Sequence, residues 1–188
     1  IPISVSFSTS AVINKSGVNV LLIGGREKKQ NAVSVLHNSI YAFDISSKKW
    51  NRKKDIPNIA TDTANLSAGC IINIDNRNII LIGGDNGKIF SLIEQLNSSI
   101  EQETDVIKKE KLFKQKLELI HHHPGFSKNI FLFNTINNTW KKISELPYSP
   151  VTTTAVLWNN QIFIAGGEIK PGERTNLILR GTIITKHL

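Results

Sequence analysis

One short motif occurs three times in the chain and strongly limits the folds that the chain can adopt. Each copy is a run of apolar, β-favouring residues that ends in two glycines. The copies span residues 19–25, 78–84 and 161–167. Two adjacent glycines at the end of a strand permit a sharp exit that residues with a Cβ resist. A strand-and-turn unit that recurs in this way predicts a repeat architecture.

An aromatic segment follows two of the three copies in the same order. Residues 38–44 precede Trp50, and residues 129–134 precede Trp140. Basic residues, a proline and a segment of small residues come after each tryptophan. This order of elements is similar to the kelch repeat, whose units of about 50 residues form four-stranded propeller blades. We therefore predict an all-β fold made of kelch β-propeller blades.

The repeats divide the chain into about two and a half blades, whereas a closed propeller typically needs four to eight. The first blade is predicted to have strands at 9–14, 19–24, 39–44 and 48–53. The second is predicted to have strands at 65–73, 78–83, 128–134 and 139–143. The third is predicted to have strands at 151–158, 161–166 and 177–185. Residues 1–188 are thus expected to form one partial kelch β-propeller.

The start of the chain supports the expectation of a partial propeller. It begins with Ile1 and contains no Met, so we expect it to be a piece of a longer protein. Exposed strand edges and unburied inner faces would destabilise such a piece on its own. We therefore expect the chain to be completed by the missing half of the propeller or by a second copy in a homodimer.

The second blade carries an insertion. The glycine pairs end at Gly25, Gly84 and Gly167, with spacings of 59 and 83 residues, and the longer spacing places an insertion at 85–127. Residues 88–100 and 103–120 are rich in helix-favouring residues, and apolar side chains recur at helical spacing in the second segment. These apolar residues are Val106, Phe113, Leu117 and Ile120. The sequence predicts two helices, which either decorate the propeller or shape a ligand site.

The loops that follow the glycine pairs are predicted to share one face of the propeller. A blade is an antiparallel meander, so its successive loops alternate between two faces. The loops 26–38, 85–127 and 168–176 then emerge together, and long loops on a rigid scaffold commonly carry function. In the last of them, a Pro171-Gly172 turn should bring Arg174 back beside Glu168. A carboxylate beside a guanidinium suits an acidic sugar or an acid/base step, and a surface salt bridge across a hairpin is the alternative.

Several of these segments together resemble a known family. The run GGEIKPGERT at 166–175, the helical insertion, the FLFN run at 131–134 and the HHHPGFS run at 121–127 carry the resemblance. They resemble the kelch-type N-acetylneuraminate epimerases, also called sialic acid mutarotases, including a cyclically permuted branch. The resemblance extends over most of the chain.

The resemblance implies a fold, an activity and two site residues. It implies a propeller of six blades, which is within the usual range of four to eight. It also implies an isomerase that interconverts the α and β anomers of N-acetylneuraminate by acid/base ring opening and closing. Glu168 then corresponds to the proton acceptor and Arg174 to a residue that binds the sugar carboxylate, while the general acid is not identified. No cofactor and no metal are implied, and the expected compartment is the periplasm, with the cytoplasm as the alternative.

Two further expectations concern the function. Because much of the propeller lies outside these 188 residues, we expect the chain alone to have little or no epimerase activity. The alternative function is a kelch module that binds a protein partner without catalysis, as many propellers do. The loop with Glu168 and Arg174, together with the helical insertion, favours the enzyme.

Composition excludes several other classes. The single Cys70 cannot form an internal disulfide and is expected to be a small core residue. The apolar runs are too short for a membrane-spanning helix, so we expect no membrane association. The net charge of +8 is spread without an arginine-rich run, so we expect no nucleic-acid partner.

Histidines and tryptophans receive structural interpretations. Adjacent His121, His122 and His123 cannot all face one ion, so a metal site is not expected. An exposed helix terminus is expected instead, and a histidine that forms a hydrogen bond in the mouth of the site is the alternative. Trp50 and Trp140 are expected to pack within the blades. Trp158 precedes a tight Asn-Asn hairpin and is also assigned a structural role.

Overall fold

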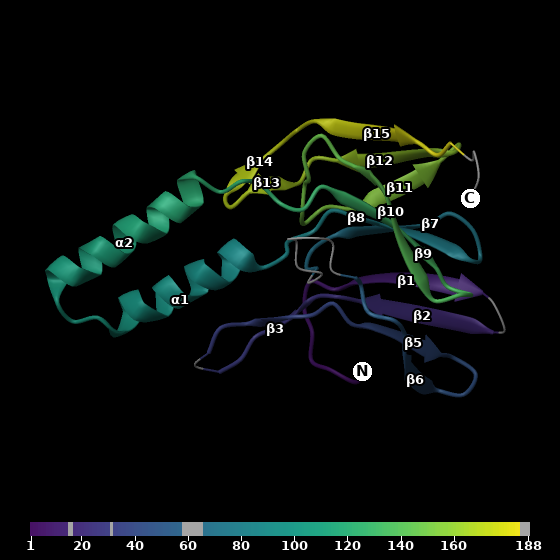
Figure 1. Ribbon diagram of the computed structural model, residues 1–188, viewed down its shortest axis with the longest axis horizontal. Helices are drawn as coiled ribbons and strands as arrows, with labels where there is room; N and C mark the ends of the chain where they lie inside the picture. Colours follow the sequence, from purple (N-terminus) through teal and green to yellow (C-terminus); the bar gives the residue numbers. More distant parts are fainter. Residues whose placement is uncertain (15–16, 31, 58–65, 185–188) are drawn as a thin grey trace.

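The computed structural model describes residues 1–14, 17–30, 32–57 and 66–184, which form three successive antiparallel sheets (Figure 1). The first sheet has the order β1 (Thr9–Asn14), β2 (Val18–Ile23), β5 (Ile40–Asp44) and β6 (Lys49–Arg52). The second has the order β7 (Cys70–Asn73), β8 (Asn78–Ile82), β9 (Asn129–Asn134) and β10 (Thr139–Glu145). The third consists of β11 (Ala155–Trp158), β12 (Gln161–Ala165) and β15 (Ile178–Thr182). The prediction of kelch β-propeller blades is confirmed.

Two strands begin later than the sequence predicted. The predictions placed their starts at 65, which lies outside the described residues, and at 151, whereas β7 begins at Cys70 and β11 at Ala155. Ser67 and Val151 instead form isolated bridges to the residues that follow the glycine pairs. The next residue in each case has a positive φ, which interrupts strand pairing before the meander starts. The predicted end of the last strand, at 185, also lies outside the described residues.

The glycine pairs have the conformation that the repeat predicted. Gly24 and Gly25 have φ values of 60° and 96°, and the other two pairs are similar. A Cβ at Gly24 would lie 2.2 Å from the backbone oxygen of Leu66, and one at Gly83 would lie 2.2 Å from Oγ of Ser149. Both the backbone angles and the neighbouring chain therefore require glycine at these strand exits.

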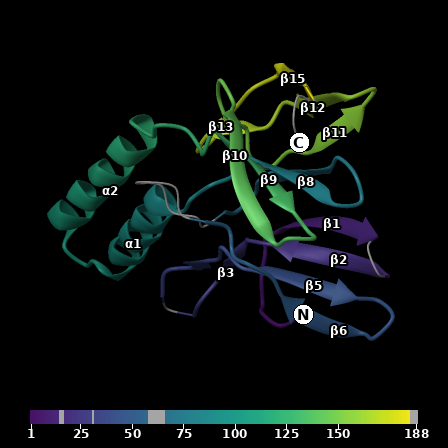
Figure 2. The same ribbon diagram turned by 45° about the vertical axis from the view of Figure 1, so that its right-hand side comes forward.

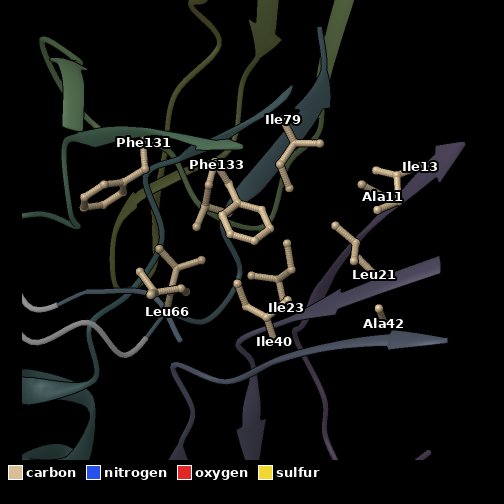
Figure 3. Packing of buried hydrophobic residues seen from close by; sticks show 12 residues of the cluster. Ala11, Ile13, Leu21, Ile23, Ile40, Ala42, Leu66, Ile79, Phe131 and Phe133 are labelled. Carbon is tan, nitrogen blue, oxygen red and sulfur yellow. The ribbon is translucent and has the colours of Figure 1, made fainter. Parts of the chain in front are cut away.

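A hydrophobic core joins the first sheet to the second (Figure 3). Alternate residues of β1, β2 and β5 face alternate residues of β8 and β9, as the period of two in a strand dictates. Its fully buried side chains are Leu21, Ile23, Ile40, Ile79, Leu81 and Phe133. Trp140 packs against this core with its ring 4.5 Å from that of Phe133, and Trp50 lies 5.0 Å from Phe43. The structural roles predicted for these two tryptophans are confirmed.

A second core joins the opposite face of the second sheet to the third. It contains Cys70, Ile72, Ile80, Ile82 and Ile164. Burial raises the pKa of the Cys70 thiol to about 11, so this residue behaves as a small core residue, as expected. Trp158 faces the other way and is 64% exposed on the outward face of the third sheet, although Asn159 and Asn160 after it do form the predicted tight turn.

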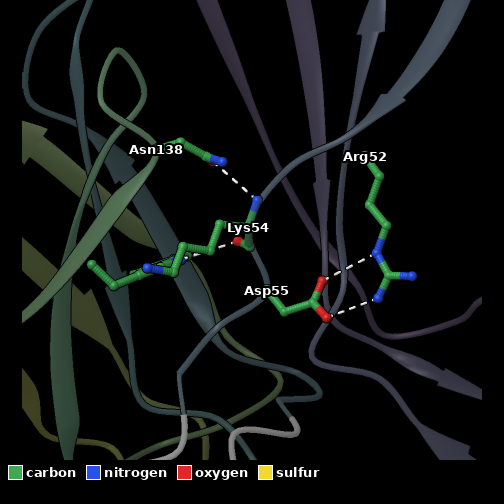
Figure 4. Close-up of polar contacts among 5 residues, drawn as sticks. Arg52, Lys54, Asp55 and Asn138 are labelled. Carbon is green, nitrogen blue, oxygen red and sulfur yellow. Dashed lines mark hydrogen bonds and ion pairs between the residues drawn. The ribbon is translucent and has the colours of Figure 1, made fainter.

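The outer seam between the first two blades is held by polar contacts near the end of β6 (Figure 4). Asn138 accepts a hydrogen bond from the backbone N–H of Lys54 at 3.0 Å, and Nε1 of Trp140 donates to the oxygen of Lys54 at 3.3 Å. Arg52 forms a bidentate pair with Asp55 on the same segment. The kelch tryptophan thus links one blade to the exit of the blade before it.

Two helices lie between β8 and β9, where the sequence predicted a helical insertion. They are α1 (Lys88–Gln102) and α2 (Val106–His121), and α2 is capped by Asp105, which accepts from the backbone N–H of Lys108. They pack on each other and extend away from the sheets as a hairpin (Figure 2). The predicted apolar face of α2 is not buried: Val106 is 78% exposed and Phe113 47%. No helix in the described residues is long and apolar enough to cross a bilayer.

Candidate functional site

The three loops that follow the glycine pairs emerge at the same end of the sheets (Figure 1). They carry the short hairpin β3 (Arg26–Glu27) and β4 (Val35–Leu36), the two helices, and the hairpin β13 (Glu168–Lys170) and β14 (Glu173–Arg174). The prediction from loop alternation, that the insertion projects from the face that carries Glu168, is confirmed. This loop face holds the candidate site.

A repeated backbone contact positions one side chain from each blade at this face. The residues directly after the glycine pairs are Arg26, Asp85 and Glu168, and each pairs with the segment that enters its own blade. The hydrogen bonds of these bridges measure 2.7–3.0 Å. Because the contact is the same in all three blades, these side chains occupy equivalent places around the loop face.

The entering segments are also linked to one another. Phe7, Ala68 and Thr152 follow the bridge residues and have φ values of 54°, 57° and 52°. The backbone N–H of Ala68 donates to the oxygen of Phe7 at 2.8 Å, and that of Thr152 donates to the oxygen of Ala68 at 3.4 Å. Positive φ is uncommon for residues with a Cβ, and three different residue types give no common sequence signal for it. This blade-to-blade connection was therefore missed from the sequence.

Glu168 and Arg174 lie opposite each other in the β13–β14 hairpin, as the turn prediction required. The half-buried Glu168 carboxylate accepts a hydrogen bond from the backbone N–H of Gly172 at 2.8 Å. Arg174 is exposed, and no ion pair joins it to Glu168 in the described part of the chain. The hairpin therefore leaves the guanidinium available to a ligand, and the surface salt bridge considered as an alternative is not formed.

The Asp85 carboxyl belongs to the second blade and interacts electrostatically with charged residues of the first and third blades. Its Oδ1 accepts from the backbone N–H of Gly87 at 2.8 Å. Burial raises the pKa of Asp85; the hydrogen bond from Gly87 and the charges of His123 and Arg26 oppose this, and Glu168 adds to it. Charges from the first blade, Arg26, and from the third, Glu168, thus both act on the Asp85 carboxyl.

His123 is a residue of the candidate site, and its environment is the alternative to the exposed helix terminus expected from the sequence. Its side chain is buried, at 5% exposure, and its Nδ1 accepts from the backbone N–H of Gly125 at 3.0 Å. Burial lowers the pKa of His123, and Lys170 adds to this while Asp85 and Glu168 oppose it. The expected exposed helix terminus is correct for the neighbouring His121 and His122 and wrong for His123, because the chain turns inward after α2.

The turn after α2 is held between the second and third blades. The backbone N–H of Ser127 donates to the oxygen of Gly84 at 2.9 Å, and a Cβ on Gly125 would lie 3.6 Å from the oxygen of Ile169 in β13. The ring of Phe126 lies 5.1 Å from that of His123. These contacts place the turn against the strand that begins with Glu168.

Arg26 is held by two aromatic rings from different elements. Its guanidinium carbon lies 4.2 Å from the ring centre of Phe7 and 4.3 Å from that of Phe90 in the first turn of α1. Two cation–π contacts from different elements restrict the movement of the guanidinium. Sequence reasoning noted Arg26 only as the residue after a glycine pair.

The helical hairpin is anchored to the loop of the first blade by Glu94 of α1. This carboxylate accepts from the backbone N–H of Ser34 at 2.7 Å, from its hydroxyl at 2.9 Å and from Lys28 at 3.0 Å. The base of α1, which carries Phe90, is thereby held close to Arg26. Among the residues that the structure describes, no group of three His, Cys, Asp or Glu side chains could hold a metal ion.

The fold defines a kelch propeller protein, and the loop-face cluster gives it a candidate charged site with residues from successive blades. Residues 5–188 match the N-acetylneuraminate epimerase family, and the chain belongs to this family.

Individual relatives agree with this assignment. The N-acetylneuraminate epimerase of Salmonella enteritidis PT4 is 26% identical over 163 residues, and N-acetylneuraminate epimerase 1 of Escherichia coli O6:H1 is 24% identical over the same length. These alignments cover 85% and 83% of this chain but 40% of each relative. The solved structure of YjhT superimposes with a TM-score of 0.68 at 18% identity, over 97% of this chain and 53% of YjhT. The chain thus spans about half the length of YjhT and less of the curated relatives.

Proposed function

We propose that this protein acts in an N-acetylneuraminate epimerase, an isomerase that interconverts the α and β anomers of sialic acid. Family membership over residues 5–188 supports the reaction class. The observation that carries the proposal is the position of Glu168, a half-buried carboxylate at the start of β13, beside Asp85 and His123 on the loop face. Such a group suits proton transfer to and from a bound sugar.

The reaction is proton transfer coupled to the opening of a cyclic hemiketal. A base removes the proton of the anomeric hydroxyl, the carbonyl forms at the anomeric carbon, and the bond from that carbon to the ring oxygen breaks. An acid protonates the ring oxygen as it leaves. Reclosure on the other face of the carbonyl reverses these transfers and gives the other anomer. The chemistry needs no metal, nucleotide or redox cofactor.

Glu168 is the proposed proton acceptor, and Arg174 the proposed ligand of the sugar carboxylate. The carboxylate is attached to the anomeric carbon, so its binding group must lie near the base. The cross-strand pairing of these two residues in the hairpin meets that requirement. A guanidinium can bind a carboxylate through two parallel hydrogen bonds, which would also fix the orientation of the sugar.

We further propose that the chain works within a larger propeller, because it spans 40% of its epimerase relatives. The missing half of the propeller, or a second copy in a homodimer, would supply the rest of the pocket. In this proposal residues 1–188 are a partial propeller and 85–127 one insertion, whose ends contribute Phe90 and His123 to the site. A small molecule, N-acetylneuraminate, is the substrate.

The proposed setting is carbohydrate metabolism in the periplasm, which rests on the family resemblance. Fractionation of the source cells with an antibody against the protein tests the compartment. Recovery with cytoplasmic markers would favour the cytoplasmic alternative.

The activity is tested with the α anomer released by a sialidase and followed by proton NMR. The completed propeller should accelerate its conversion to the β anomer, and the 188-residue chain alone should do so little or not at all. A completed propeller that leaves the conversion at its spontaneous rate would contradict the proposed function. Rapid conversion by the chain alone would contradict the need for further blades.

A further inference from the structure

Arg26 is held more rigidly than an arginine on a loop ordinarily is. Its backbone N–H and C=O both bond to Ser6 at 2.8 Å, which fixes the start of the side chain. Its guanidinium carbon lies over the rings of both Phe7 and Phe90, 4.2 and 4.3 Å from their centres. Side-chain entropy that a ligand would otherwise have to remove is therefore already lost.

The hydrogen-bonding edges of this guanidinium are not used within the described part of the chain. Phe7 and Phe90 contact the guanidinium through their rings and offer its five N–H donors no oxygen acceptor. No side-chain hydrogen bond or ion pair of Arg26 is found among the described residues, and the side chain is only partly buried. A planar cation that two aromatic rings hold in place, and whose N–H donors form no hydrogen bond within the described residues, is suited to bidentate recognition of a carboxylate.

The position of Arg26 connects it with the proposed site. Arg26 of the first blade and Glu168 of the third both directly follow a glycine pair and form the same bridge to the segment that enters their blade, and the charges of both act on Asp85 between them in the sequence. An anion held by the edge of Arg26 would therefore lie on the same loop face as the proposed base.

We propose that Arg26 is a carboxylate-binding residue of this site and that it contributes to the preference for an acidic sugar over a neutral one. The inference rests on the proposed function for the identity of the sugar, and on the structure for the chemistry of the binding group. It adds to the site a preorganised cation from the first blade. A purely structural role, in which Arg26 only joins Phe7 to Phe90, is the alternative that the test must separate.

The test measures binding to the completed propeller by ligand-detected NMR with three probes. These are N-acetylneuraminate, the simple carboxylate pyruvate, and the neutral sugar N-acetylmannosamine. Arg26→Gln should weaken binding of both carboxylates roughly 10- to 100-fold and leave the neutral sugar unchanged. Arg26→Lys should recover only part of the loss, because it restores the charge but not the planar fork.

Arg180→Gln is the matched control. Arg180 is an exposed arginine of β15, so its replacement makes the same change in net charge away from the loop face. Equal carboxylate binding by Arg26→Gln and Arg180→Gln would overturn the inference, as would undetectable carboxylate binding by the wild-type completed propeller. If Arg26→Gln does not fold, Arg26→Lys decides: full wild-type affinity in that variant would also overturn the proposed fork.

The two proposals fail in different ways. Carboxylate binding that depends on Arg26, without anomer conversion by the completed propeller, would support this inference and contradict the epimerase function. Anomer conversion at the wild-type rate and affinity in a completed propeller that carries Arg26→Gln would support the epimerase function and contradict this inference.

Discussion

Two arginines border the candidate site, and they are held in contrasting ways. Arg26 is fixed at its backbone by Ser6 and at its guanidinium by two phenylalanine rings. Arg174 lies in a strand of two residues, is exposed, and forms no side-chain hydrogen bond or ion pair within the described residues. A rigid cation binds with little further loss of entropy, whereas a mobile one must be ordered by its ligand. We therefore expect Arg26 to contribute more to affinity and Arg174 to adjust to the sugar near the base.

The largest expected effect concerns Glu168, the proposed base, beside which both arginines would bind the sugar carboxylate. In the completed propeller, Glu168→Gln keeps the size of the side chain but removes the base, so the rate of anomer exchange should fall by roughly 10²–10⁴. Binding of the sugar should change little. Proton exchange NMR measures the rate, and calorimetry measures the affinity.

Glu173→Gln is the control for this variant, since Glu173 is an exposed carboxylate of the same hairpin. It should leave the rate unchanged. A wild-type rate in Glu168→Gln would show that Glu168 is not the base. The two arginines could then no longer be compared as residues that bind the sugar beside one catalytic group.

The next effect compares the arginines directly. Arg174→Ala should weaken N-acetylneuraminate binding by about 0.5–1 kcal/mol, because an exposed charge pair is screened by water. A loss of 2–5 kcal/mol is expected only where such a pair becomes buried. Calorimetry beside Arg26→Gln decides the order of the two residues. A larger loss of binding free energy for Arg174→Ala than for Arg26→Gln would show that an arginine held rigid before binding does not contribute more to affinity here than one that the ligand orders.

A smaller effect isolates the rigidity of Arg26 from its charge. Phe90→Ala removes one of the two covering rings and should weaken carboxylate binding about two- to fivefold, in line with one exposed cation–π contact. Phe113→Ala, on the exposed surface of α2, is the control for loss of a helix phenylalanine. If Phe90→Ala and Phe113→Ala bind carboxylates equally well, the aromatic covering does not matter to binding.

The repeats made most of the fold predictable. Glycine pairs, a fixed place for tryptophan and alternating apolar residues specify strands, exits and blade cores through local rules that act wherever the pattern occurs. The face from which the insertion projects also followed, because loop alternation in a meander is a matter of topology. The hairpin that pairs Glu168 with Arg174 was predictable from Pro171-Gly172, since a turn brings its flanking residues together.

The rest of the site depends on contacts between blades, and these have no local pattern. Arg26 meets Phe90 only because α1 is anchored by Glu94 to a loop some sixty residues earlier in the chain. His123 is buried because its turn bonds to Gly84 and lies against β13, whereas the adjacent His122 remains exposed. Neither outcome can be read from residue type or spacing.

His123 provides the smallest predicted effect, a change in how stability depends on pH. Burial lowers its pKa, so the folded state binds fewer protons here than the unfolded state as the pH falls through the ordinary histidine range. His123 should therefore contribute stability that is fully present above about pH 6.5 and is lost as the pH falls through its lowered value. His123→Gln should flatten this part of the decline in the free energy of unfolding between pH 7 and 5, measured by urea titration.

The neighbouring charges set the control for this measurement. Asp85 acts in the opposite direction, because burial raises its pKa and the folded state then gains protons first on acidification. Lys170 strengthens the shift of His123, and Glu168 weakens it. Subtracting the wild-type free energy of unfolding from that of His123→Gln at each pH removes the contributions of Asp85, Lys170 and Glu168, which both proteins contain. His121→Gln, at an exposed position of α2, corrects for the loss of a histidine from the unfolded chain. If the two variants lose stability in parallel as the pH falls, the buried His123 is not the group whose protonation opposes folding, and the inward turn after α2 does not impose the environment described for it.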